Sequence, residues 1–449
     1  MVRDLTVGNP RKVLLLYALP LFGSNVFQQL YSVADSFVAG HFIGTEALGA
    51  VGNAFELILI YNCLSFGFSL AISVITAQYF GKKDIARLKS SVYTSLLSFG
   101  TVALAVMAVM MLLAPHLFGL INTPAALYAD SLAYFNVYSL GFLFVVAYNA
   151  AQGIFSALGD SKTPFIFLVF SSVSNVILDI VFVTQFNMGI TGTAWASLLC
   201  QGVSGIASLT LALVRLKKLE CSETASLFSI PLLKELTSVA LPSIAQQLFI
   251  SIGNIILQSV VNVFGENATG GFAAVMKLNV VAIISMNSIC NAMSNFAGQN
   301  SGAGKPQRIR QGVGSAFFLN CIVALLFTGG FYLLAPQLVG LFITDGNQAA
   351  AEVGITFLHI VSPFYLILSF KQVLDGAMRG VRKMSFFVFS CLSEMFLRVV
   401  LAYPLSAWFG LNGVWMAWPC AWVISTVISI VLYRILDRKN FGVTNICQA

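Results

Sequence analysis

The chain has 449 residues, of which 58% are hydrophobic and only 9% are charged, and its formal net charge is +7. Because soluble domains have about a quarter of their residues charged, this composition excludes an ordinary soluble protein and predicts an all-α polytopic membrane protein. The basic residues are spread over short loops and form no continuous patch, so the positive charge does not indicate a nucleic-acid partner.

Twelve apolar segments follow one another, each of roughly 20 to 30 residues and long enough to cross about 30 Å of hydrocarbon. They lie near residues 13–39, 47–79, 90–114, 131–157, 164–186, 190–215, 236–264, 272–299, 313–335, 353–378, 385–407 and 412–434. With a cytoplasmic N-terminus, the inner loops hold every basic residue except Lys277, Lys371 and Arg398, and the outer loops hold none. This distribution predicts a multi-pass protein of the cytoplasmic membrane with both termini in the cytoplasm.

The second half of the sequence repeats the first. LAPHLFGLINT begins at Leu113, and its counterpart LAPQLVGLFIT begins at Leu334; the same offset relates Gly189 to Gly410. A constant offset over a long stretch predicts two parallel repeats of six helices, related by an axis along the membrane normal. The predicted parts are an N-terminal lobe at 1–216, a cytoplasmic linker at 217–234 and a C-terminal lobe at 235–449.

Parallel repeats are typical of transporters whose substrate site lies between the halves and is opened to each side by rocking. A channel is the alternative, and it would need one continuous pore lined by polar rings in both halves. The chain has no Walker A loop, no H-E-x-x-H motif and only three histidines, which are isolated from one another, so we expect neither an enzyme nor a cofactor. GDSKTP at Gly159–Pro164 is interpreted as a tight turn.

Charged residues inside the apolar segments are few: Asp35, Glu56, Asp179, Lys277, Lys371, Asp375, Glu394 and Arg398. Those of the second half include two pairs with a spacing of four residues, Lys371 with Asp375 and Glu394 with Arg398. Such pairs can meet on one helix face, and both a structural and a functional role stay open. The first half has embedded carboxylates and no embedded base, which is typical of an ion-coupling site.

Four oxygen-bearing side chains of the first half are expected at a similar depth. Asn175 lies one helical turn from Asp179, Ser197 follows on the next helix, and Asp35 comes from the first helix. Hard cations prefer oxygen ligands, and two close carboxylates favour retention of a proton, so this cluster can hold Na+ or H+. The alternative is a buried polar network that only joins helices.

The first segment contains Pro20, which removes an intrahelical hydrogen bond and predicts a kink. Gln28, Tyr31 and Asp35 are spaced to form a polar stripe on one face of this helix. Glu56 and Lys277 are related by the offset of the repeat and are therefore repeat equivalents of opposite charge. Our hypothesis is that these two residues pair across the interface between the lobes as a latch; the alternative is that each has separate partners.

Several motifs together resemble the multidrug and toxic compound extrusion (MATE) family, over essentially the whole chain. They are QQLYSVADS with GTEALGAVG, AYNAAQGIFSALGDSKTP at Ala147–Pro164, SNVILDIVF followed by GITGTAWAS at Ser174–Ser197, and GAMRG at Gly376–Gly380. The resemblance implies twelve helices in two V-shaped lobes, alternating access, and export of small organic, often cationic compounds driven by inward Na+ or H+ flow.

The resemblance also assigns roles to single residues. It implies a first-lobe cation site, and a Na+ site if coupling is to sodium, at Asp35, Asn175, Asp179 and Ser197, the last in place of a threonine. It implies drug contacts at Gln28, Tyr31, Asn149 and Ser172, and the helix kink at Pro20.

The second lobe departs from part of the family pattern. Where the branch named for NorM has a glutamate in helix seven, this chain reads SIAQQLF with Gln246 and Gln247, and Lys371 adds an unexpected base. The DinF-like branch, which relies on the first-lobe aspartates, is the better match. We expect a monomeric exporter with no cofactor other than the coupling ion. A flippase of a lipid-linked precursor is the alternative, which a wide cationic central cavity would favour, and a receptor or structural membrane protein is a third reading.

Overall fold

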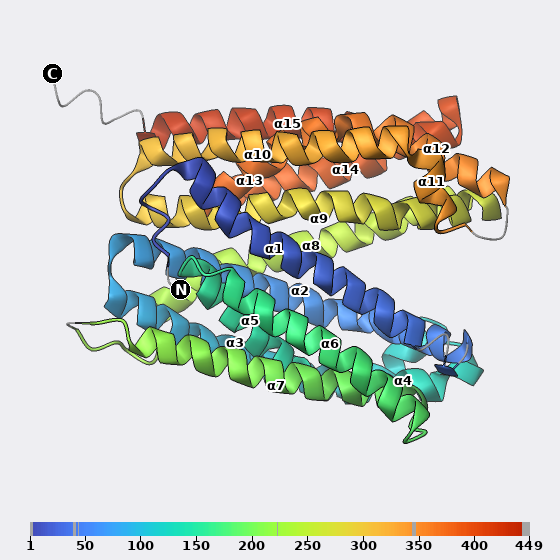
Figure 1. Ribbon diagram of the computed structural model, residues 1–449, viewed down its shortest axis with the longest axis horizontal. Coiled ribbons are helices and arrows are strands. Elements are labelled where there is room, and N and C mark those ends of the chain that lie inside the picture. The colour runs from blue at the N-terminus through green and yellow to red at the C-terminus, as the bar shows by residue number, and fades with distance from the viewer. Residues whose placement is uncertain (1–2, 39–41, 44, 222, 344–346, 442–449) are drawn as a thin grey trace. The chain divides into compact units, whose positions relative to one another are not determined.

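The computed structural model describes the chain except for residues 1–2, 39–41, 44, 222, 344–346 and 442–449, and except for the side chains of residues 30–38, 45–48 and 439–441. The described residues form helices and connecting turns, without a strand (Figure 1). The helices are α1 (Pro10–Val38), α2 (Thr45–Lys82), α3 (Ile85–Leu120), α4 (Ala125–Leu140), α5 (Phe142–Ala157), α6 (Lys162–Thr184), α7 (Gly189–Lys217), α8 (Ile230–Asn262), α9 (Glu266–Gly302), α10 (Pro306–Leu333), α11 (Ala335–Gly340), α12 (Gln348–Val361), α13 (Tyr365–Gly380), α14 (Met384–Phe409) and α15 (Leu411–Phe441).

This architecture confirms the predicted class of helical membrane protein. With α12 and α13 taken together, ten helical segments of the described residues are long and apolar enough to cross a membrane, and α4 with α5 adds one span that is bent by 45°. The 29-residue helix α1 covers the first predicted apolar run. A helix therefore occupies each predicted apolar run, because a helix satisfies its backbone hydrogen bonds within one segment in hydrocarbon.

The fourth and tenth spans are interrupted at equivalent positions. α4 ends before Gly141, and α12 ends before the 3-10 turn Ser362–Phe364, whose first residue is related to Gly141 by the offset of the repeat. Pro363 lacks the amide hydrogen that a continuous α-helix would use there. Gly141 has helical dihedral angles, with φ −75° and ψ −14°, at the junction of α4 and α5. The breaks therefore belong to the repeat, although the apolar runs alone did not indicate them.

The chain forms two compact units. Unit 1 comprises Met1–Asp4 and Gly23–Ile244, and unit 2 comprises Leu5–Phe22 and Ala245–Ala449. The change of unit within α1 follows Pro20, and the change within α8 follows Pro242. The linker is packed within unit 1, where the N–H of Ser226 donates to Ser90 Oγ over 2.9 Å. The lobe boundaries drawn from the repeat, 1–216 and 235–449, stay a prediction.

Each unit has the same close approach between two helices. A Cβ atom at Gly153 of α5 would lie 2.6 Å from the backbone oxygen of Ser69 on α2. In unit 2, a Cβ atom at Gly376 of α13 would lie 2.5 Å from the backbone oxygen of Cys290 on α9. Ser69 and Cys290 are related by the offset of the repeat. Gly376 lies two residues beyond that offset from Gly153, but the two glycines make the corresponding contact in their units. Glycine is required at both places because no side chain fits between the backbones.

The core of unit 2 is rich in aromatic side chains. Trp415 and Trp422 of α15 are fully buried, and Phe357 lies 5.1 Å from Trp415 between ring centroids. The hydroxyl of buried Tyr365 donates to Asn279 Oδ1 over 2.8 Å, so its polar atom is satisfied inside the core. These contacts hold α9, α12, α13 and α15 together.

The GDSKTP segment forms the turn between α5 and α6, as predicted. Asp160 is 2% exposed and accepts hydrogen bonds from the N–H groups of Lys162 and Thr163, each over 3.1 Å. It also pairs with Arg215 of α7, whose guanidinium lies over the Phe155 ring. The turn therefore caps α6 and joins α6 to α7.

We expect Asp160→Asn to lower the stability of unit 1 by about 2 kcal/mol at neutral pH, because hydrogen bonds to a charged group contribute roughly 1.5–3 kcal/mol. Burial alone would raise the pKa of Asp160, but the hydrogen bonds from Thr163 and Arg215 outweigh it and hold the pKa below its ordinary value. The stabilisation is therefore complete above the unfolded-state pKa of about 3.9 and is lost as the pH falls through the lower folded-state pKa. Thermal unfolding of the purified protein should show a deficit at pH 7 that shrinks toward pH 3. A deficit of equal size at every pH would contradict this prediction.

Candidate functional site

The centre of the candidate site is a polar nest between α6 and α7. Asn175, Asp179 and Ser197 are all buried, and Asp179 is 0% exposed. In the amide orientation that suits both neighbours, the NH₂ group of Asn175 donates to Asp179 Oδ2 over 2.9 Å. Its oxygen then accepts from the N–H of Ser197 over 3.1 Å and from its hydroxyl over 3.3 Å. The structure thus brings together three of the four predicted cation ligands.

Local sequence explains why these side chains meet. Asn175 and Asp179 are four residues apart and therefore project from the same face of α6. α7 approaches α6 closely at Gly192, where a Cβ atom would lie 3.2 Å from Phe182 Cβ on α6, and a small residue allows this approach. Ser197 is thereby positioned beside Asn175.

The nest is formed by oxygen-bearing side chains, and the neighbouring sequence has no cationic side chain. Between Lys162 and Arg215 there is no lysine, arginine or histidine, and α2 and α3 have no lysine or arginine in their apolar parts. A buried carboxylate in such surroundings is stabilised by hydrogen bonds, a bound cation or a proton. The nest can therefore bind a small cation without displacing a basic side chain of α6 or α7.

The other predicted site residues occupy different places. The side chains of Asp35 and Tyr31 lie outside the described residues, and Gln28 is exposed on α1. Ser172 is buried on α6, one turn before Asn175. Asn149 of α5 donates to the Val145 carbonyl of its own helix over 2.9 Å. A role of these residues in drug binding stays a prediction.

The residues predicted to act in lobe movement are in described parts of the helices. Pro20 is buried inside α1. Glu56 is exposed on α2, and Lys277 is exposed on α9 with its Nζ 5.4 Å from the ring centroid of Phe342. The pairing of Glu56 with Lys277 as a latch stays a prediction.

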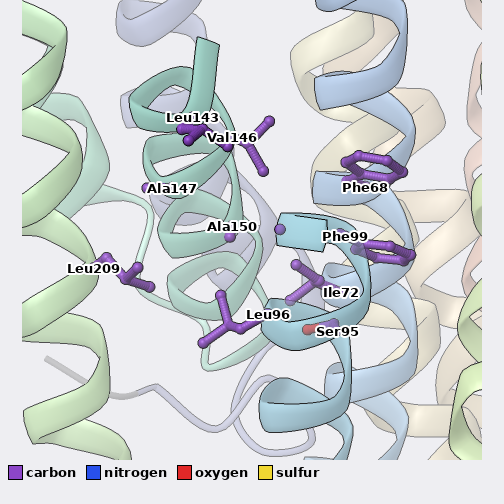
Figure 2. Close-up of a pocket in the computed structure, with 11 residues that line it drawn as sticks. Phe68, Ile72, Ser95, Leu96, Phe99, Leu143, Val146, Ala147, Ala150 and Leu209 are labelled. Carbon is purple, nitrogen blue, oxygen red and sulfur yellow. The ribbon is translucent and has the colours of Figure 1, made fainter. Parts of the chain in front are cut away.

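A cavity of about 170 Å³ lies within unit 1 between α2, α3, α5 and α7. Figure 2 shows side chains from these four helices around it, with the Phe68 and Phe99 rings stacked 4.3 Å apart at one side. The lining is apolar except for Ser95. Sequence reasoning did not identify this cavity, since its residues are ordinary core types spread over four helices; it can hold hydrocarbon or a small apolar group.

Unit 2 contains a network of four charges, of which Lys371, Asp375 and Arg398 are buried and Glu394 is partly buried. Lys371 Nζ lies 2.6 Å from Asp375 Oδ2 on α13 and 2.9 Å from Glu394 Oε2 on α14. Glu394 Oε1 pairs with Arg398 and accepts a hydrogen bond from Trp422 Nε1 over 3.1 Å. The two pairs expected from their spacing are therefore present, but Lys371 joins them into one network, which the sequence did not indicate.

Hydroxyl groups complete this network. Asp375 Oδ1 accepts from Ser390 of α14 over 2.7 Å and from Ser429 of α15 over 3.3 Å. Ser390 and Ser429 are themselves 2.6 Å apart. Arg398 also lies over the Trp418 ring, 4.1 Å from its centroid. Every carboxylate oxygen of the network thus has a donor.

The repeated sets of long apolar helices define the class of the protein as a multi-pass helical membrane protein with a buried polar nest. The MatE family model matches residues 20–181 and 242–404, one stretch in each half. The chain therefore belongs to the MatE family, whose curated members include multidrug resistance proteins. This confirms the family resemblance, while the placement in the DinF-like branch stays a prediction.

Known relatives extend over nearly the whole chain. The probable multidrug resistance protein YpnP of Bacillus subtilis (strain 168) is 27% identical over 438 residues, which cover 96% of each chain. The FAD transporter of Shewanella oneidensis is 25% identical over 449 residues, covering 95% of this chain and 94% of the relative. A solved outward-facing structure of a multidrug resistance MATE transporter has the same fold, with a TM-score of 0.90, 22% identity and 98% of both chains covered.

Proposed function

We propose that this chain is a monomeric secondary antiporter of the cytoplasmic membrane, with both termini in the cytoplasm, that exports small organic compounds in exchange for Na+ or H+. Asp35, Asn175, Asp179 and Ser197 bind the coupling cation. The observation that carries the proposal is the nest of Asp179, Asn175 and Ser197, in which a fully buried carboxylate is surrounded by an amide and a hydroxyl.

The chemistry of the nest supports cation exchange. Carboxylate, amide and hydroxyl oxygens are ligands for a hard cation, and the same carboxylate can take up a proton instead. Either event neutralises a buried negative charge, so it changes the relative energies of the conformations in which the nest is dry or open to water. Alternating access then couples this change to release of the exported compound.

The names of the relatives support a substrate class for this proposal. Several are named multidrug resistance or multidrug export proteins, which supports organic drug-like compounds as substrates. The FAD transporter among the relatives supports an anionic dinucleotide as the second candidate.

Proteoliposomes with imposed gradients test the proposal. A cationic dye, norfloxacin and FAD are loaded separately, and efflux is recorded under a Na+ gradient, a pH gradient or neither. We expect one gradient to accelerate efflux of at least one compound, and Asp35→Asn to abolish that acceleration. Asp130→Asn, a matched change at an exposed carboxylate of α4, should leave it unchanged. Efflux at equal rates with and without both gradients would overturn the proposal.

Substitutions at Ser197 test whether this residue is a cation ligand or only packs between helices. Ser197→Thr keeps the hydroxyl and should leave the cation dependence within about twofold of wild type, whereas Ser197→Ala removes one oxygen ligand. Since a lost neutral hydrogen-bond partner is worth about 1 kcal/mol, we expect Ser197→Ala to raise the half-saturating cation concentration about fivefold. The measurement is the initial transport rate as a function of Na+ concentration or pH. Equal cation dependence in both variants would exclude Ser197 as a ligand.

A further inference from the structure

The charged network of unit 2 has the ligands of a cation site but also a cation of its own. Lys371 Nζ lies between Asp375 Oδ2 at 2.6 Å and Glu394 Oε2 at 2.9 Å, and Lys371 is 2% exposed. The carboxylates come from two different helices, α13 and α14. An ammonium group at this point therefore occupies the centre of a pair of carboxylates that could otherwise bind an ion together.

The described charged and titratable groups around Lys371 either belong to this network or point elsewhere. Arg398 is paired with Glu394 Oε1, and Cys391 Sγ lies 3.7 Å from Asp375 Oδ2. Arg379 donates to Asn291 Oδ1 on α9 over 2.6 Å and lies within 3.9 Å of Cys290 Sγ. The four central charges therefore cancel without an external ion.

Equivalent positions of the two repeats differ in charge between unit 1 and unit 2. The equivalent glycines Gly153 and Gly376 align Lys371 with Tyr148 and Asp375 with Gln152. Tyr148 donates its hydroxyl to the Pro164 carbonyl over 3.1 Å and carries no charge. Unit 1 thus has a carboxylate nest with no basic side chain on its helix pair, whereas unit 2 has carboxylates with an inserted base.

We propose that Lys371 is the built-in cation of unit 2, and that its ammonium occupies the place between Asp375 and Glu394 that Na+ or a proton would otherwise take. Unit 2 then has no exchangeable cation, and coupling is confined to unit 1. This last step rests on the proposed function, but occupation of the unit 2 site by Lys371 does not, and the two can be tested separately.

The test uses the purified full-length protein and two readouts, binding of radioactive Na+ and thermal unfolding in NaCl, choline chloride and buffers from pH 5 to 8. Asp179→Asn serves as the parent because it removes the charge of the unit 1 nest. The parent should bind no Na+ specifically. Adding Lys371→Met empties the position between the carboxylates, so the double variant should bind Na+ or should be stabilised by several degrees in Na+ or at acidic pH, with choline as the ionic-strength control.

Two further variants in the same parent serve as controls for the charge of Lys371 and for the carboxylate of Asp375. Lys371→Arg retains the positive charge and should show no response to Na+ or pH beyond that of the parent. Lys371→Met with Asp375→Asn removes a base and an acid together, so it should fold and lose most of the response. If Lys371→Met alone fails to fold in choline at pH 8, recovery of folding in Na+ or at pH 5 supports the proposal. If it fails to fold in all conditions while the version with Asp375→Asn folds, the result shows that the Asp375 carboxylate needs the positive charge of Lys371 beside it.

Two results would overturn the proposal. In the first, Asp179→Asn still binds Na+ and loses that binding when Asp375→Asn is added, which would mean that unit 2 exchanges a cation with Lys371 in place. In the second, the Lys371→Met variant is as stable as its parent and responds to neither Na+ nor pH. Failure of the proposed function is recognised separately, by efflux from wild-type proteoliposomes that depends on no gradient.

Discussion

Asp179→Asn is expected to lower the initial rate of gradient-driven export by about a hundredfold or more, which corresponds to about 2.7 kcal/mol. Asp179 is fully buried on α6 and supplies the only carboxylate among the described side chains of the α6–α7 nest. Asparagine preserves the size of the side chain but cannot carry the negative charge that a cation or proton neutralises. The measurement is dye efflux from proteoliposomes under the gradient that drives the wild type.

Retained substrate binding separates lost coupling from lost folding. The Asp179→Asn protein should bind the dye within about threefold of wild type, since its fold is unchanged, and it should unfold at a similar or higher temperature because a buried charge has been removed. Asp130→Asn is the control for a carboxylate change on the exposed side of α4. Wild-type export rates in Asp179→Asn would show that the nest only joins α6 to α7.

Gly376→Ala is expected to destabilise unit 2 by about 2 kcal/mol or more, and Gly376→Val to prevent accumulation of folded protein. The added Cβ atom would lie 2.5 Å from the Cys290 carbonyl oxygen, which belongs to the backbone of α9 and cannot rotate away. Overpacking of this kind costs roughly 1–3 kcal/mol, more than the helix propensity of alanine returns. The measurement is the unfolding temperature in detergent, followed by size-exclusion chromatography.

Two glycine controls test the geometry behind this expectation. Gly314→Ala on α10 adds a Cβ atom with nothing within 4 Å and should be neutral or slightly stabilising. Gly153→Ala in unit 1 meets the Ser69 carbonyl oxygen at 2.6 Å and should repeat the loss seen at Gly376. Equal unfolding temperatures for the Gly376 and Gly314 variants would refute the proposed backbone contact.

Parts of the site were predictable because they depend on local geometry. Asn175 and Asp179 share a face of α6 through their spacing of four residues, and the depth of Ser197 follows from its distance along the next helix. The paired charges of unit 2 were likewise expected from their spacing. By contrast, the contact of Lys371 with Glu394 joins two helices, and sequence spacing carries no information about which faces of separate helices meet.

Sequence by itself determined the class, the twelve helical segments and the repeat, because hydrocarbon admits a spanning segment chiefly as a long apolar helix and because the constant offset between the two halves is visible in the letters. Tertiary structure alone decided where the fourth and tenth spans break, how the apolar cavity of unit 1 is lined, and that Lys371 joins two carboxylates rather than one. These features depend on side chains from helices far apart in the chain, and their distances are fixed by helix packing, which no local pattern records.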